Sequence, residues 1–179
     1  MNKQTIIDAL TKNYTSFIQY INSLTSEEYL YRFEQKWTAG QQLEHILLCV
    51  KPLVQVYGMD KLMIEQNFGK SDRAGRTQEG LLGLYAEKLK GGGKAPERFV
   101  PQAAEFSQRD GLNETLAKLI KDLCSKIENF TEEDLNTLLI PHPLLGNLTL
   151  REMLYNAIDH VEHHHESAKQ NLKKQIGIH

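Results

Sequence analysis

The chain has 179 residues, of which 40% are apolar and 25% charged, and its formal net charge at pH 7 is −2. This length suits one domain with its own core, and the charge leaves no basic surface for nucleic acid. No apolar run approaches the ~20 residues of a membrane span and the polar start does not resemble a signal peptide, so we expect one cytoplasmic domain over residues 1–179.

The first predicted element is an amphipathic helix over residues 3–23, where apolar side chains recur at helical spacing. A capping box from Thr25 to Glu28 predicts a short turn of helix after it. A second capping box, Thr38 with Gln41, begins the next long helix. The main apolar stripe of that helix consists of Leu43, Ile46, Leu47, Val50 and Val54.

His45 lies on a second face of this helix, together with Cys49, Pro52 and Leu53. A helix that is apolar on two faces is usually central to its bundle. Two interpretations of His45 stay open: a half-buried histidine bonded to a carbonyl, or a metal ligand. Cys49 is either a buried structural thiol or a nucleophile or soft ligand. Because Cys49 and Cys124 are far apart in helical patterns, we expect no disulfide.

The middle of the chain, residues 68–110, is rich in glycine and proline. We interpret it as a long crossover with one helix near residues 77–89, because neither flank could fold alone. A third core helix is predicted at about residues 112–130, and Thr131 caps a short turn after it. No stretch alternates like a strand. The sequence therefore predicts an all-α protein without a sheet.

A proline-rich loop, residues 140–146, leads to the last predicted helix, which runs from Leu150 to about Lys173. Thr149 and Glu152 form the capping box at its start. The connection lengths predict a four-helix bundle with up-down-down-up order, since short links join antiparallel helices and a long crossover allows parallel ones.

Four of the seven histidines fall within six residues of this last helix. At ~100° per residue, His164 lies within its apolar face and His160 at the edge, whereas His163 points away. An i,i+4 pair can offer two imidazoles to one metal ion, although two ordinary buried polar residues are the alternative. In the predicted topology His45 reaches the same depth, which favours a common site.

Two stretches of the chain carry a family resemblance. Residues 37–47 contain Trp-Thr and then Gln-Leu-Glu-His-Ile-Leu, and residues 142–154 read His-Pro-Leu-Leu-Gly-Asn-Leu-Thr-Leu-Arg-Glu-Met-Leu before His160 and His164. This pattern resembles the second helix, and the approach to the fourth, of the DinB-like (YfiT-like) superfamily of four-helix bundles. The resemblance covers most of the chain.

In that superfamily one histidine of the second helix and two of the fourth bind a divalent metal ion, often zinc or nickel. The resemblance therefore implies His45, His160 and His164 as the metal ligands. It also implies a thiol-dependent transferase or isomerase that uses bacillithiol, mycothiol or glutathione, or a metal-dependent hydrolase. Relatives commonly have glutamine three residues after the last ligand, where this chain has Ser167.

Three neutral imidazoles leave coordination positions open for water or substrate, as catalytic metal sites require. Helical phase puts Glu44, Asp159 and Glu162 on different faces from their neighbouring histidines, so we assign no general base. His142, in the loop before the last helix, either faces solvent or approaches the site.

Two classes of function stay open. The first is a metal-dependent enzyme, thiol-S-transferase-like or hydrolytic, that acts on a small electrophilic substrate and uses a divalent ion with or without a low-molecular-weight thiol. The second is a non-catalytic helical protein that binds metal or serves regulation. An open cavity over the metal would favour the first class and a sealed site the second. We expect a small-molecule partner, a homodimer, and neither nucleic acid nor a membrane.

Overall fold

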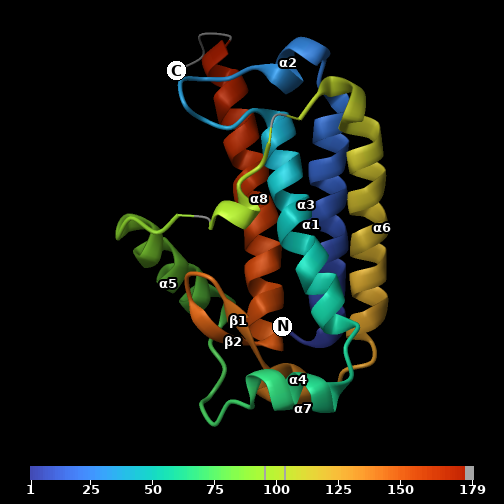
Figure 1. The fold of residues 1–179 in the computed structure, drawn as a ribbon, viewed down its shortest axis with the longest axis vertical. Helices are drawn as coiled ribbons and strands as arrows, with labels where there is room; N and C mark the ends of the chain where they lie inside the picture. The colour runs from blue at the N-terminus through green and yellow to red at the C-terminus, as the bar shows by residue number, and fades with distance from the viewer. Residues whose placement is uncertain (95, 103, 176–179) are drawn as a thin grey trace.

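The four long helices of the chain form an up-down-down-up bundle, as the connection lengths predicted. The computed structural model describes residues 1–94, 96–102 and 104–175. Figure 1 shows the first and last long helices running in one direction and the middle two in the other. The four helices are α1 (Lys3–Ser23), α3 (Ala39–Tyr57), α6 (Arg109–Ile127) and α8 (Leu150–Gln175).

The bundle is closed by contacts of α1 and of α3 with both α6 and α8, so α1 and α3 lie on opposite corners. Each helix turns its apolar stripe inward, which removes the apolar surface from water. None of the helices in the described ranges combines the length and apolar character needed to cross a membrane. Fully buried core residues include Ile6, Leu10, Phe17, Ile21, Leu43, Ile46, Leu116, Leu123, Leu150, Leu154 and Val161.

The helix starts follow the capping residues. Thr25, Thr38 and Thr131 form the capping boxes of α2 (Ser26–Leu30), α3 and α7 (Glu132–Thr137). At the start of α8 the Thr149 and Glu152 side chains exchange hydrogen bonds with each other's backbone amides. These boxes satisfy backbone donors that a helix start leaves without partners.

The third core helix lies three residues earlier than predicted at both ends. Its start at Arg109 follows directly from a 3-10 turn, η2 (Phe106–Gln108), in which Glu105 and Gln108 form a capping box. Its end at Ile127 is followed by a turn that buries Phe130 outside the helix. The apolar period therefore predicted the helix correctly but placed both of its ends three residues too late.

The long crossover from α3 to α6 contains α4 (Lys61–Phe68), α5 (Gln78–Lys90) and a 3-10 turn, η1 (Glu97–Phe99). The predicted helix near residues 77–89 is α5, whereas α4 was not predicted. In Figure 1 α5 lies beside α8, outside the bundle, in agreement with the contacts between these two helices. The crossover therefore covers one side of α8.

The prediction that the chain has no sheet is wrong in one place. Strands β1 (Leu139–His142) and β2 (Gly146–Thr149) pair antiparallel just before α8. Each strand has only four residues and β1 contains a proline, which hides the period-two pattern that identifies longer strands. Gly146 starts β2 with φ of +72°, a conformation that glycine adopts without strain.

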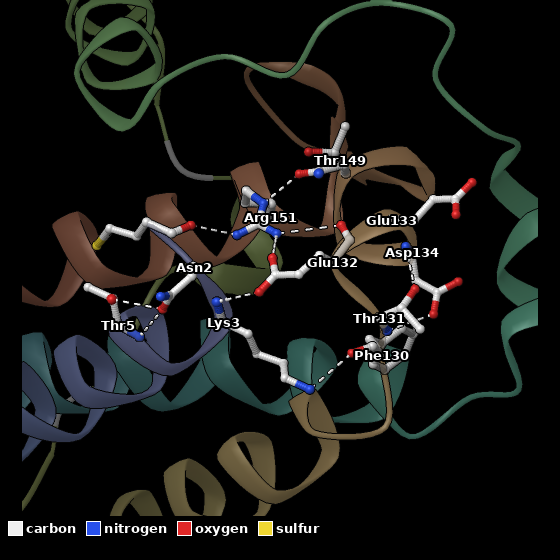
Figure 2. A network of polar contacts seen from close by, with 12 residues as sticks. Asn2, Lys3, Thr5, Phe130, Thr131, Glu132, Glu133, Asp134, Thr149 and Arg151 are labelled. Carbon is white, nitrogen blue, oxygen red and sulfur yellow. Dashed lines mark hydrogen bonds and ion pairs between the residues drawn. The ribbon is translucent and has the colours of Figure 1, made fainter.

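A polar network closes the end of the bundle where α1 and α8 begin. Figure 2 shows Arg151 of α8 donating to Glu132 of α7. Arg151 also donates to the carbonyl of Met1. The amide of Lys3 donates to Glu132 at 2.9 Å, and its ammonium group donates to the carbonyl of Phe130 at 3.2 Å. Arg151 is 9% exposed, so these contacts fix how α1, α7 and α8 meet.

Candidate metal centre

The structure brings the three predicted histidines together. His45 projects from the second turn of α3, and His160 and His164 project from successive turns of α8. The Nε2 atom of His160 lies 3.2 Å from Nε2 of His45 and 3.0 Å from Nε2 of His164. Their ligand atoms all lie within 4.8 Å of one another, so this group could hold a metal ion.

The spacing of these nitrogens suits one tetrahedral ion. Zinc binds imidazole nitrogen at about 2.0–2.1 Å, which places two ligand nitrogens of a tetrahedron ~3.3 Å apart. The two Nε2–Nε2 distances that involve His160, 3.2 and 3.0 Å, are close to this value. The ligand atoms of the third pair, His45 and His164, lie within 4.8 Å of each other.

Two of the histidines are oriented through their other ring nitrogen. His45 donates from Nδ1 to the carbonyl of Phe99 at 2.7 Å, and His164 donates from Nδ1 to the side-chain oxygen of Gln42. A proton on Nδ1 leaves the lone pair on Nε2, which then points into the group. Supporting contacts of this kind are typical of histidines that bind metal ions.

All three rings are held neutral. Burial, together with the neighbouring His45, lowers the pKa of His160 to about 3. Burial lowers the pKa of His45 despite its bond to Phe99, and burial together with His160 lowers the pKa of His164 well below 6.5. Neutral imidazole is the form that binds a metal ion.

The residues present fit a cation in this position. With protons on Nδ1 of His45 and His164, at least two lone pairs face each other around His160. Lone pairs at this spacing repel each other. A proton on Nε2 of His160 could make a full hydrogen bond to His45 or to His164, but not to both. A divalent cation would satisfy all three nitrogens at once.

The neighbours of the three histidines are aromatic and sulfur-containing. The ring of Trp37 lies 4.9 Å from the His45 ring and 6.1 Å from the His164 ring, between centroids. The sulfur of Cys49 lies 3.7 Å from Nε2 of His45, outside the three-ligand group. Burial raises the pKa of Cys49 to about 12, so it stays a thiol. This favours the structural interpretation of Cys49 over a nucleophile.

A cavity of about 470 Å³ adjoins the three histidines, with His45 and His160 in its wall. It lies between α3 and α8 under the crossover and the hairpin. His142 also lines it, so the interpretation in which this residue approaches the site holds. Most of the wall is apolar and is formed by Val50, Pro52, Leu53, Val56, Phe68, Leu89, Phe99, Ile140, Pro141, Leu144, Met153 and Ala157, among others.

The acidic residues near the histidines in sequence stay away from this cavity, as helical phase predicted. Asp159 accepts a hydrogen bond from Gln78 at 2.6 Å, and Glu162 is exposed. Neither of these residues nor Glu44 lines the cavity. His163 is exposed and lines a separate polar cleft, together with Ser167.

Sequence reasoning missed the residues that support the ligands. Gln42 was noted only as part of a motif, and its signal was its position three residues before His45 on a buried helix face. Phe99 acts through its backbone carbonyl, which no side-chain pattern reveals. The acceptor for Nδ1 of His164 is the side-chain oxygen of Gln42, whereas Ser167 lines the separate cleft with His163.

Replacing Gln42 by leucine is expected to lower zinc affinity about 10–100-fold, because the variant leaves Nδ1 of His164 without its acceptor. The measurement is competition with a chromophoric chelator at constant pH. Gln42→Glu is the matched control: it keeps an acceptor at this position and should retain or raise the affinity. Equal affinities of wild type and Gln42→Leu would contradict the role of this contact.

Comparison with family models matches residues 9–168 to the DinB superfamily. No curated protein and no solved structure gave a match.

Proposed function

The chain belongs to the DinB superfamily, and on this premise we propose that it is a metal-dependent enzyme that acts on a small electrophilic substrate. The proposed ligands of its divalent ion are His45, His160 and His164. The observation that carries the proposal is the convergence of their Nε2 atoms at the wall of an open cavity. Zinc and nickel are the proposed metals, since imidazole nitrogen suits both.

A divalent ion in this position would act as a Lewis acid that lowers the pKa of a bound thiol or water and so supplies a nucleophile near neutral pH. The three histidines would hold this ion, and Phe99 and Gln42 orient the rings of His45 and His164. The apolar wall of the cavity excludes water around the reacting group, which strengthens electrostatic interactions there.

A thiol is the favoured nucleophile. No aspartate or glutamate lines the cavity in the described part of the chain. Attack by water usually needs such a base, whereas a thiol has an unperturbed pKa of about 8.5 and ionises readily on a metal. We therefore propose transfer of a low-molecular-weight thiol first and hydrolysis second. The thiol and the electrophile would be the small-molecule partners, and the cytoplasm that we propose as the location of the protein would keep the thiol reduced.

The alternative is a non-catalytic bundle that binds metal or serves regulation. That alternative predicts a sealed site, as structural metal centres have. The cavity beside His45 and His160 speaks for an enzyme instead, because it leaves room for a substrate next to the ion.

The test uses cobalt-substituted protein and a small thiol such as 2-mercaptoethanol. Binding of the thiol should produce a sulfur-to-cobalt charge-transfer band that strengthens as pH rises towards the pKa of the free thiol. Conjugation of the thiol to an electrophile such as 1-chloro-2,4-dinitrobenzene should stop when a chelator is added.

The His160→Ala variant should show neither the band nor the activity. A cobalt protein that binds no thiol, and that hydrolyses nothing across an ester and amide panel, would favour the non-catalytic alternative.

A further inference from the structure

The polar side chains in the wall of the cavity next to the three histidines include hydrogen-bond donors but no carboxylate in the described part of the chain. Away from the histidine group, its polar side chains come from Tyr85, Arg98, His142 and Asn156, together with Tyr14 and Cys49. Tyr14 already donates to the carbonyl of Ala157 at 3.3 Å. The cavity therefore offers hydrogen-bond donors and one cation, and no anion.

The proton on His142 is placed by the turn of the hairpin. Nδ1 of His142 accepts hydrogen bonds from the amides of Leu144 and Leu145, at 3.1 and 3.2 Å. Burial lowers the pKa of His142, so the ring is neutral. A neutral ring whose Nδ1 accepts must carry its proton on Nε2. His142 is therefore a fixed donor and not a general base.

Asn156 supplies a polar side chain to the cavity wall without a partner of its own. It lines the cavity together with His142, and no hydrogen bond of the described residues engages its side-chain amide. The two protons on its amide nitrogen are therefore available to a molecule inside.

The distance from Asn156 to the histidine group is set by α8. Asn156 precedes His160 by four residues, so the two side chains lie on the same face about 5–6 Å apart. Tyr85 also lines the cavity, with its ring 6.2 Å from that of His142, and so does the exposed Arg98. A bound molecule thus meets a donor one helical turn from the proposed ion.

We propose that the cavity binds a largely apolar molecule, neutral or anionic, whose acceptor oxygen is held by the Asn156 amide one helical turn from His160, and that it rejects cations. This inference rests on the proposed function, since it names the substrate class of the same site.

The test measures binding of three simple probes to zinc-loaded protein by calorimetry: hexanamide, octanamide and octylammonium. Octanamide should bind about fifteenfold more tightly than hexanamide, because two more CH₂ groups are buried. Octylammonium, with the same chain and a positive charge, should bind at least tenfold more weakly than octanamide. Equal binding of octylammonium and octanamide, or no dependence on chain length, would overturn the proposal.

Single substitutions test whether octanamide binds inside the cavity and at Asn156. Asn156→Leu, of similar volume, should lower octanamide affinity about tenfold, and Asn156→Asp should reverse the charge preference in favour of octylammonium. Val56→Trp fills the cavity and should abolish binding, whereas Val100→Trp, outside the cavity, should not. Octanamide affinity that is unchanged in both Asn156 variants would contradict the role of the amide.

The His160→Ala variant separates the two proposals, because it should lose zinc and still bind octanamide with the same chain-length dependence. If the wild type binds no metal while these probe preferences hold, the proposed function fails and the cavity inference stands. If zinc binds and the preferences are absent, the cavity inference alone fails.

Discussion

Replacing His160 by alanine is expected to lower zinc affinity by more than about a hundredfold while the helical content stays unchanged. His160 is the central ligand, because its Nε2 lies 3.2 Å from that of His45 and 3.0 Å from that of His164. Loss of a contact that merely supports a ligand costs about 10–100-fold, so loss of a ligand should exceed that. Chelator competition measures the affinity, and circular dichroism measures the helical content.

The companion variants His45→Ala and His164→Ala should lose the metal in the same way. His163→Ala is the matched control, since His163 lies on the same helix and is exposed. Wild-type metal content in all three ligand variants would rule out the assignment, as would metal loss confined to His163→Ala.

Replacing Glu152 by glutamine is expected to lower the free energy of unfolding by on the order of 3 kcal/mol. The Glu152 side chain is 1% exposed and accepts two hydrogen bonds of 2.6 Å from Arg73. It also accepts from the backbone amides of Arg76 and Thr149, at 2.8 and 3.0 Å. One carboxylate thus caps α8 and anchors the crossover that covers the cavity. Urea unfolding at pH 7 measures the loss.

The same carboxylate predicts how stability depends on pH. Burial alone would raise the pKa of Glu152, but the hydrogen bonds from Arg73, Arg76 and Thr149 outweigh it and hold the pKa at about 2. An unfolded glutamate has a pKa of about 4.3, so this stabilisation is complete above that value and is lost as pH falls towards 2. Wild type should therefore lose more stability than Glu152→Gln between pH 5 and pH 2.

The matched control for this variant is Glu79→Gln, an exposed glutamate in the first turn of α5, whose effect should stay within about 0.5 kcal/mol. If the free energy of unfolding depended on pH in the same way in wild type and in Glu152→Gln, Glu152 would not stay ionised at low pH in the folded protein.

Most of the helical bundle could be predicted from the sequence, because the patterns that mark its helices are local. Each capping box lies within four residues, so the starts after Thr25, Thr38, Thr131 and Thr149 could be predicted one by one. The apolar period fixed which face of each helix is buried. The helical phase of α8 separated His160 and His164 from His163, and the family pattern supplied His45 as their partner.

What the sequence did not reveal depends on contacts between distant residues. Glu152 meets Arg73 across 79 positions, and His45 meets a backbone carbonyl of the crossover across 54. The hairpin was missed because its strands are short and β1 contains a proline, and β1 is what brings His142 to the cavity. The homodimer and the cytoplasmic location stay predictions.

Anomalous diffraction from crystals of the zinc-loaded protein tests the central claim most directly. The account predicts one zinc peak about 2.0–2.1 Å from Nε2 of His45, His160 and His164, with its remaining coordination position open to the cavity. A zinc ion bound instead by His163 or by Cys49, or no peak among the three histidines at saturating zinc, would contradict it.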